Sequence, residues 1–491
     1  MTTAPDTATP EASLAGGSPP SASPPVASSP GTSRHQASWR DPAGFVYRRD
    51  GALLRQVQPA WAEEWAAFAA SPLAKRLVDA GRLVGWQDAP LADAFDESAA
   101  AVIRPELVPF VSYPYEWTFG QLRDAALLTL DVQAAAIAAD WTLKDATAYN
   151  VAFRGVTPVL IDHLSFQRLP ADSPWVAYQQ FCEHFLAPLA LMARRDVRMG
   201  RMLRDQLDGI PLDLAATLLP GRTKLRLGLG AHVHLHARSQ RSHAGDARKP
   251  TEVRLSRSRL SALVESLRGT IGGLRWEPEG TEWADYADKG HLSYEGGTPD
   301  AKEAIVRDLL AAAGPGAGRT CWDLGANTGR FSAIAAAQGY RVLSFDIDPA
   351  AAERHYRALR AAGRTDTTPI VMDLADPSPG LGWAGRERAS LVERANADVI
   401  LALALVHHLG IGRNVPLAMV MGLFADLAPQ AIVEWVPRGD PMVDILLASR
   451  EDVFVDYTTE GFEAAVASRY DVASRTPIAG SPRVLYHLVR R

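Results

Sequence analysis

Cysteine is scarce in this chain, because only Cys182 and Cys321 occur among its 491 residues. Two cysteines so far apart in the sequence provide neither a disulfide framework nor a zinc site with paired cysteine ligands. Long apolar runs are also missing, since none reaches the ~18 residues that a membrane-spanning helix needs. These absences exclude a disulfide-stapled or membrane-embedded protein and favour a cytoplasmic one.

An excess of positive charge is likewise absent. The formal net charge is −5, which predicts attraction neither to nucleic acid nor to a membrane surface. The segment "HVHLH" at 232–236 places its histidines alternately, as on a strand. No cysteine or carboxylate cluster accompanies them, so a polar strand face is favoured over a metal site and no metal is expected.

Composition and pattern divide the chain into four parts. Residues 1–38 are rich in Pro, Ser and Ala and are expected to be a disordered tail. Residues 39–235 begin with strand-like segments that turn at Asp50-Gly51, include a strand-like stretch at 107–117, and continue with helical patterns, which predicts an α+β domain. Residues 236–275 are expected to be a linker and a helix, and residues 276–491 form the last domain.

The last domain alternates strand and helix patterns from residue 301 onward. Such alternation predicts an α/β fold with a Rossmann-like, mostly parallel sheet. The C-terminal stretch "YDVASRTPIAGSPRVLYHLVRR" is expected to add an antiparallel hairpin at the edge of that sheet.

The segment "WDLGANTGRFS" at 322–332 carries the most specific signal in the chain. An apolar strand ends at Asp323, and Gly325, Asn327 and Gly329 follow in a loop that opens a helix. Asp346 ends the next strand, about 20 residues after the first glycine, where an acid binds ribose hydroxyls. The NAD loop has the pattern G-x-G-x-x-G, whereas this loop has Asn in it and a carboxylate just before it. That carboxylate suits an ammonium group, and the helix N-terminus suits a carboxylate. S-adenosylmethionine offers both groups and a ribose.

Four segments in order, "DLGANTGRFS", "VLSFDIDP", "VMDLAD" and "ADVILALALVHHL", resemble the motifs of class I S-adenosylmethionine-dependent methyltransferases. The resemblance covers about residues 280–491 and implies a methyltransferase with S-adenosylmethionine as its cofactor. It implies one group of contacts for each part of the cofactor: Asp323, Gly325, Asn327 and Gly329 toward the methionine end, Asp346 with Ile347 toward the ribose, and Asp373 with Leu374 toward the adenine.

Two histidines follow the fourth strand of this domain, where an acceptor would meet the cofactor. His407 or His408 is a candidate general base for a hydroxyl or amine acceptor. Packing at the strand end is the alternative role, since methyl transfer can proceed by positioning alone. The acceptor cannot be read from the sequence, and a small molecule is favoured over a protein. Tyr286, Tyr294 and Lys302 are expected either to cover the cofactor as a lid or to pack on the sheet.

The segments "LKDATAYN" and "LIDHLSF" place Asp145, Asn150 and Asp162 at the spacing that kinases use to orient a hydroxyl and hold magnesium. Residues 44–219 thus resemble the protein-kinase and aminoglycoside-phosphotransferase fold, with 112–117 in the place of the adenine-binding hinge. Two features depart from that family: Gly44 is the only glycine of the nucleotide loop, and Arg55 stands where a lysine is expected.

Three functions therefore stay open for the whole chain. The first is a methyltransferase whose kinase-like module binds substrate or regulates. The second is a bifunctional protein in which that module also transfers phosphate, and the third is a binding protein without catalysis. The three kinase-like residues are expected to cluster, so that either magnesium or a basic neighbour such as Lys144 or Arg55 must offset their charge, and the basic neighbour is favoured.

Overall fold

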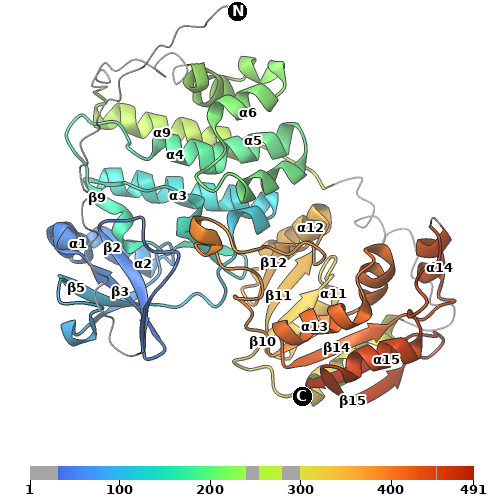
Figure 1. Cartoon of the computed structure of the whole chain (residues 1–491). Coiled ribbons are helices and arrows are strands. Elements are labelled where there is room, and N and C mark those ends of the chain that lie inside the picture. Colours follow the sequence, from blue (N-terminus) through green and yellow to red (C-terminus); the bar gives the residue numbers. More distant parts are fainter. Residues whose placement is uncertain (1–30, 239–253, 279–298, 449) are drawn as a thin grey trace, which may run out of the picture.

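The computed structural model describes residues 31–238, 254–278, 299–448 and 450–491. It consists of an N-terminal half, built from a sheet lobe and a helical lobe, and a C-terminal α/β domain that lies against both lobes (Figure 1). In the ranges that the structure describes, none of the helices combines the length and the apolar character needed to cross a membrane.

The sheet lobe is a five-stranded antiparallel sheet in the order β1-β2-β3-β5-β4, flanked by two helices. Its hairpin turns at Asp50-Gly51 as expected, with φ of +48° and +80°. The elements are β1 (Thr32–Arg34), β2 (Gly44–Arg49), β3 (Ala52–Val57), α1 (Ala62–Ala69), α2 (Pro72–Asp79), β4 (Trp86–Ala89) and β5 (Ala101–Pro105).

Two expectations about this lobe were wrong. The disordered tail was expected to reach residue 38, but β1 lies within it and pairs with β2. Composition gives no sign of this edge strand, because backbone hydrogen bonds and the stacking of Arg34 on Phe45 hold it. Residues 107–117 were expected to form a strand. They contain only a 3-10 turn at Pro114–Glu116, because Phe110 packs in the core of the C-terminal domain while Tyr113, Tyr115 and Trp117 pack in that of the N-terminal half.

The helical lobe is built on the long helix α3 and contains two short two-stranded sheets, β6 with β9 and the hairpin of β7 and β8. The elements are α3 (Phe119–Ala138), β6 (Trp141–Leu143), β7 (Val151–Arg154), β8 (Thr157–Leu160), β9 (Phe166–Arg168), α4 (Tyr178–Phe181), α5 (Ala187–Arg194), the 3-10 helix η7 (Val197–Arg204), α6 (Leu212–Leu218), α7 (Leu227–Leu229) and α9 (Arg257–Gly272). The order of strands followed by helices confirms the α+β prediction.

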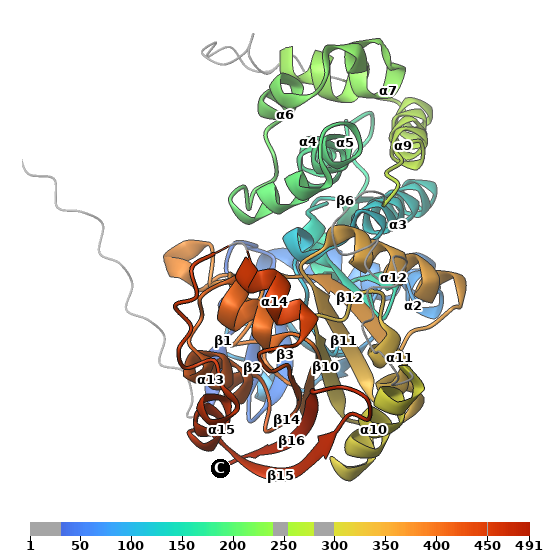
Figure 2. The same cartoon turned by 90° about the vertical axis from the view of Figure 1, so that its right-hand side faces the viewer.

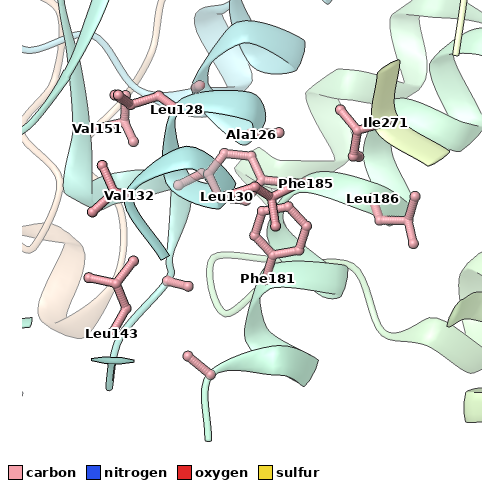
Figure 3. Packing of buried hydrophobic residues seen from close by; sticks show 14 of the residues in the cluster. Ala126, Leu128, Leu130, Val132, Leu143, Val151, Phe181, Phe185, Leu186 and Ile271 are labelled. Carbon is pink, nitrogen blue, oxygen red and sulfur yellow. The ribbon is translucent and has the colours of Figure 1, made fainter. Parts of the chain in front are cut away.

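Helix α9 belongs to this lobe and is no part of a linker. Its apolar residues Leu260, Val264, Leu267 and Ile271 are buried in the same core as α3 and α5. Figure 3 shows part of this core, with Ile271 and Leu186 among the labelled residues. The expected strand at 232–236 is also wrong: the segment is helical, and His232 hydrogen-bonds Tyr178 at 2.8 Å and Ser266 at 2.9 Å.

The C-terminal domain is a seven-stranded sheet in the order β12-β11-β10-β13-β14-β16-β15. The first five of these strands are parallel and the last two are antiparallel, which confirms the Rossmann-like fold with an added hairpin (Figure 2). The elements are α10 (Pro299–Ala312), β10 (Thr320–Leu324), α11 (Arg330–Ala337), β11 (Arg341–Asp346), α12 (Pro349–Ala361), β12 (Thr367–Val371), β13 (Val399–Ala402), α13 (Leu417–Leu427), β14 (Gln430–Trp435), α14 (Pro441–Ala448), α15 (Thr459–Ala467), β15 (Tyr470–Pro477) and β16 (Val484–Arg490).

Alternate residues of the central strands face opposite layers of helices. Trp322 and Phe345 pack with α13 and α15, whereas Cys321 and Val342 pack with α10 and α11. This period of two is the geometry of a sheet that is covered on both faces. The parallel strands consequently end at one common edge, where the loops that carry the candidate cofactor residues emerge.

The N-terminus of α3 joins the two halves of the molecule. Thr118 and Gln121 form a capping box at 2.9 and 3.2 Å. The next free donor of the helix, the Gly120 N–H, reaches the buried Glu353 carboxylate of α12 at 2.8 Å. One turn further, Asp124 accepts the Tyr356 hydroxyl at 2.6 Å. A carboxylate at a helix N-terminus is favourable for both the dipole and the unpaired N–H groups.

Gly120 leaves no room for a side chain at this junction. A Cβ there would lie 2.8 Å from the Tyr356 ring and 3.0 Å from Glu353. We expect Gly120→Ala to lower the free energy of unfolding by ~1–3 kcal/mol in urea titrations, because the crowding outweighs the better helix propensity of alanine.

The matched control is Gly269→Ala in α9, where an added Cβ meets no atom within 4 Å. That change should stabilise by ~0.5–1 kcal/mol. Equal shifts of the same sign in both variants would contradict a crowded junction.

Candidate functional site

The loop after β10 forms an open cradle at the carboxyl edge of the sheet. Gly325 and Gly329 have φ of +78° and +83°, and Asn327 has φ of +50°. A Cβ at Gly325 would meet only Leu405 at 3.5 Å, so the space above the strand end admits a ligand. At Gly329 a Cβ would lie 2.0 Å from the His355 ring, so this glycine is required for packing of the loop on α12.

Two buried carboxylates flank the cradle. Asp346 accepts hydrogen bonds from the backbone N–H of Asn327 at 2.7 Å and of Asp348 at 2.8 Å, and it thereby fixes the loop. Asp323 accepts the Ser332 hydroxyl at 2.6 Å. Burial raises the pKa of each carboxyl to about 6, and the neighbouring Asp346 charge adds to the shift of Asp323. A cationic or hydroxyl-bearing ligand would therefore stabilise the ionised form of both carboxyls.

The expected adenine side lies at the ends of β11 and β12. Ile347 is 43% exposed beside the cradle, and Leu374 is buried. Asp373 accepts from the Ala375 N–H at 2.9 Å and pairs with Arg413 at 3.2 Å. The structure therefore brings all the expected cofactor residues to one edge of the sheet, although their role in binding stays a prediction.

His407 and His408 follow β13 with ring centroids 4.1 Å apart. His407 is 1% exposed and His408 is half-buried. Burial lowers the pKa of His408 to about 4 and that of His407 well below its usual value, so both rings are neutral at pH 7. Ala404, before them, has φ of +51°, a strained backbone of the kind found at functional sites.

A buried network of charges surrounds this pair. Lys302 contacts the fully buried Glu434, which also pairs with Arg483 at 3.3 Å. Arg483 pairs further with Asp440 at 2.6 Å. Of the three expected lid residues, Lys302 lies in this network under the site, and Tyr286 and Tyr294 fall outside the described residues.

In the N-terminal half, the structure brings Asp145, Asn150 and Asp162 together. Asn150 hydrogen-bonds Asp145 and also donates to the Ser165 hydroxyl at 3.2 Å, and Ser165 donates to Asp162 at 2.7 Å. The Arg55 guanidinium lies 2.5 Å from the Asp162 carboxylate. Arg55 was therefore correctly expected as the neutralising residue, whereas Lys144 pairs with Asp41 at 2.9 Å.

The two carboxyls respond differently to this arrangement. Burial, and then the charge of Asp162, raise the pKa of Asp145. Burial would raise the pKa of Asp162 too, but the Arg55 charge and hydrogen bonds lower it overall. In the ranges that the structure describes, no group of three or more His, Cys, Asp or Glu side chains is arranged to hold a metal ion.

A loop of the C-terminal domain, residues 378–394, lies against Tyr113, Glu116 and Tyr149 of the N-terminal half. The Arg388 guanidinium stacks 4.2 Å from the Tyr149 ring, and the Ala389 N–H donates to the Tyr113 hydroxyl at 2.9 Å. The Arg394 guanidinium donates two hydrogen bonds, of 2.5 and 3.0 Å, to the Glu116 carboxylate. The segment 112–117, expected as a nucleotide hinge, is thus covered by this loop (Figure 1).

The chain matches no protein-family model. It is 36% identical over 469 residues to the nodulation protein NoeA of Rhizobium meliloti strain 1021, and the alignment covers 93% of this chain and 96% of that protein. The chain belongs to the NoeA family. Membership extends across both halves, so the NoeA family joins the sheet and helical lobes to the α/β domain in one protein.

Solved structures resemble only part of this NoeA-family chain. The magnesium protoporphyrin IX methyltransferase ChlM of Synechocystis PCC 6803 with bound SAM has a TM-score of 0.31 and 17% identity, over 42% of this chain and 88% of that one. The N-methyltransferase NodS of Bradyrhizobium japonicum WM9 has a TM-score of 0.29 and 12% identity, over 41% of this chain and 98% of that one. The bifunctional kinase-methyltransferase WbdD has a TM-score of 0.28 and 16% identity, over 41% and 42%. TM-scores and identities this low support no conclusion about the reaction of this NoeA-family chain, so its reaction must be argued from its own residues.

Several residues near the site carried no signal in the sequence. Glu434, Arg483 and Asp440 lie in separate segments, and only the sheet order brings them to the histidine pair. Glu353 sits mid-helix in α12, where an acidic residue is ordinary. Its burial against α3 could not be inferred without the arrangement of the two halves.

The ion pair between Arg55 and Asp162 yields a prediction about stability. Both side chains are mostly buried, so Arg55→Ala leaves an uncompensated carboxylate and should cost ~3–5 kcal/mol in urea unfolding. Magnesium should restore more stability to this variant than to the parent, because a cation then replaces the lost charge.

Lys144→Ala is the control, since its pair with Asp41 is more exposed and should contribute under ~1 kcal/mol. A similar loss of stability in both variants would contradict a larger contribution of the Arg55–Asp162 pair to the free energy of unfolding.

Proposed function

We propose that this chain is an S-adenosylmethionine-dependent methyltransferase whose acceptor binds at the carboxyl ends of β13 and β14. The geometry that carries the proposal is the pair of buried carboxylates, Asp323 and Asp346, on either side of an open glycine loop. An ammonium group suits Asp323, and ribose hydroxyls suit Asp346. The acceptor is unidentified, and we favour a small molecule over a protein, a nucleic acid or a membrane.

The residues of the chain would act mainly by binding and orientation. Bound S-adenosylmethionine supplies a methyl group on a sulfonium, which is already activated for displacement. The carboxylates fix the cofactor, and the buried wall of His407, Lys302 and Glu434 excludes water from the acceptor side. His408, neutral and half-buried, is the better placed of the two imidazoles to take a proton.

The proposal is tested by incubating the full chain with S-adenosylmethionine labelled on the methyl group and with cell extract from a producing organism. Products are then identified by mass spectrometry. Label should enter a small molecule with the wild type and not with Asp323→Asn. Absence of cofactor binding to the wild type in calorimetry would refute the proposal.

The raised pKa of the carboxyls predicts how cofactor affinity depends on pH. The ionised form binds the cofactor, so affinity should be constant above pH 7 and fall about tenfold per unit and per group below pH 6. Calorimetry with S-adenosylhomocysteine between pH 5 and 8 measures this.

The Asp346→Asn variant should bind S-adenosylhomocysteine more weakly than the wild type by ~2 kcal/mol at pH 7.5, because a charge-assisted hydrogen bond is lost. The same variant should show a flatter pH profile, as one of the two titrating groups is gone. Equal affinity of the wild type at pH 5 and 8 would contradict a role for both carboxylates.

The histidine pair can be resolved by single substitutions. If His408 removes a proton, His408→Ala should lower turnover ~10²-fold or more and leave cofactor affinity nearly intact. His407→Ala should instead lower thermal stability, because it opens a cavity at a fully buried position. Equal turnover in both variants would assign the pair to structure alone.

For the N-terminal half we propose a kinase-like module that binds substrate or regulates the methyltransferase domain. The clustering of Asp145, Asn150 and Asp162 supports the kinase-like assignment, and two contacts argue against phosphate transfer. Arg55 pairs with the carboxylate that would hold magnesium, and loop 378–394 covers the expected hinge. Phosphoryl transfer depends on positioning, and a single glycine in the nucleotide loop would hold phosphates poorly.

The second candidate, a bifunctional protein with an ATP-dependent phosphotransferase, is tested by titrating the full chain with ATP and magnesium. Binding should be weak or absent. Micromolar binding, with phosphate transfer that is lost in Asp145→Asn, would establish this candidate instead.

A further inference from the structure

A cavity of ≈ 260 Å³ lies between the two halves of the molecule, next to the expected adenine side of the cofactor site. Its C-terminal wall includes Ile347, Met372 and Asp373 at the ends of β11 and β12. Its other wall comes from the N-terminal half, where Trp117 precedes α3 and Val197 starts η7. Sites for whole drug-sized ligands span ~300–1,000 Å³, so this cavity suits one part of a ligand.

The walls combine apolar with charged side chains, since Arg198, Arg201, Arg204 and Arg413 also line the cavity. This mixture suits a flat ring with polar edges. Trp117 and Val197 face the cavity from one side, and Ile347 and Met372 from the other. Asp373 supplies an acceptor for an amino group at its rim. A purine has this shape and these polar edges, and Ile347 directly follows the carboxylate that would hold the ribose.

The N-terminal half also holds the loop that carries Asp373. Arg204 of η7 forms two hydrogen bonds, of 3.0 and 3.2 Å, to the Asp376 carboxylate three residues further on. Arg201 adds a contact at 3.4 Å. The pairs are partly exposed and contribute little stability, but the two-point geometry sets the position of the loop.

We propose that the N-terminal half forms the second wall of the adenosine site, so that S-adenosylmethionine is bound by both halves of the chain. This inference rests on the proposed function and adds residues outside the four methyltransferase-like segments. The N-terminal half thereby acts on methyl transfer through cofactor binding.

The test fills the cavity from the N-terminal side. In the full chain, Val197→Trp should weaken binding of S-adenosylhomocysteine at least tenfold in calorimetry. It should equally weaken binding of adenosine, which probes the purine end alone. Leu225→Trp is the control on the same half, because Leu225 is 89% exposed and lies away from the cavity. This control should bind like the wild type.

A second variant covers the case in which Val197→Trp does not fold. Arg204→Glu places like charges against Asp376 and should weaken both ligands, whereas Arg222→Glu, exposed on the same half, should not. Failure of the wild type to bind S-adenosylhomocysteine would refute the proposed function itself. Wild-type binding that is unchanged in Val197→Trp and Arg204→Glu would refute only the shared site.

Discussion

The contact between the N-terminus of α3 and helix α12 is the constraint on which the arrangement of this protein depends. A helix N-terminus has unpaired N–H donors, and here one of them is satisfied by Glu353 from the other half of the chain. Each of the two groups would be destabilising if it were buried alone, because a carboxylate and an N–H both lose hydrogen bonds to water on burial. This contact therefore favours the association of the two halves.

A second contact between the two halves involves residues 378–394 of the C-terminal domain and the segment 112–117. Glu116 and Arg394 bury their charges against each other there. The position expected for a nucleotide hinge is consequently an interface. The cavity beside Ile347 adjoins this interface, because Tyr115, Trp117 and Ser378 also line it.

The surroundings of Asp323 and Asp346 shift their pKa in the opposite direction to that of Asp162. Asp323 and Asp346 are buried without a cationic partner of their own, and their pKa rises to about 6. Asp162 is equally buried, yet Arg55 lowers its pKa and satisfies its charge. A carboxylate with an unsatisfied charge is ready for a ligand, whereas a paired one is not. This difference favours chemistry in the C-terminal half.

The sequence by itself determined the α/β domain, its antiparallel hairpin and the expected positions of the cofactor residues, because glycine turns, alternating strands and strand-end acids are local patterns. It also predicted that Asp145, Asn150 and Asp162 would meet, since one short hairpin joins them. It failed for β1, for residues 107–117 and for the histidines at 232–236, where pairing or packing with distant segments overrides local preference. Only the tertiary structure decided that α9 completes the N-terminal core, that Arg55 neutralises Asp162, and that two halves enclose one cavity. These features depend on contacts between residues far apart in the chain, whose side chains meet only after both halves have folded.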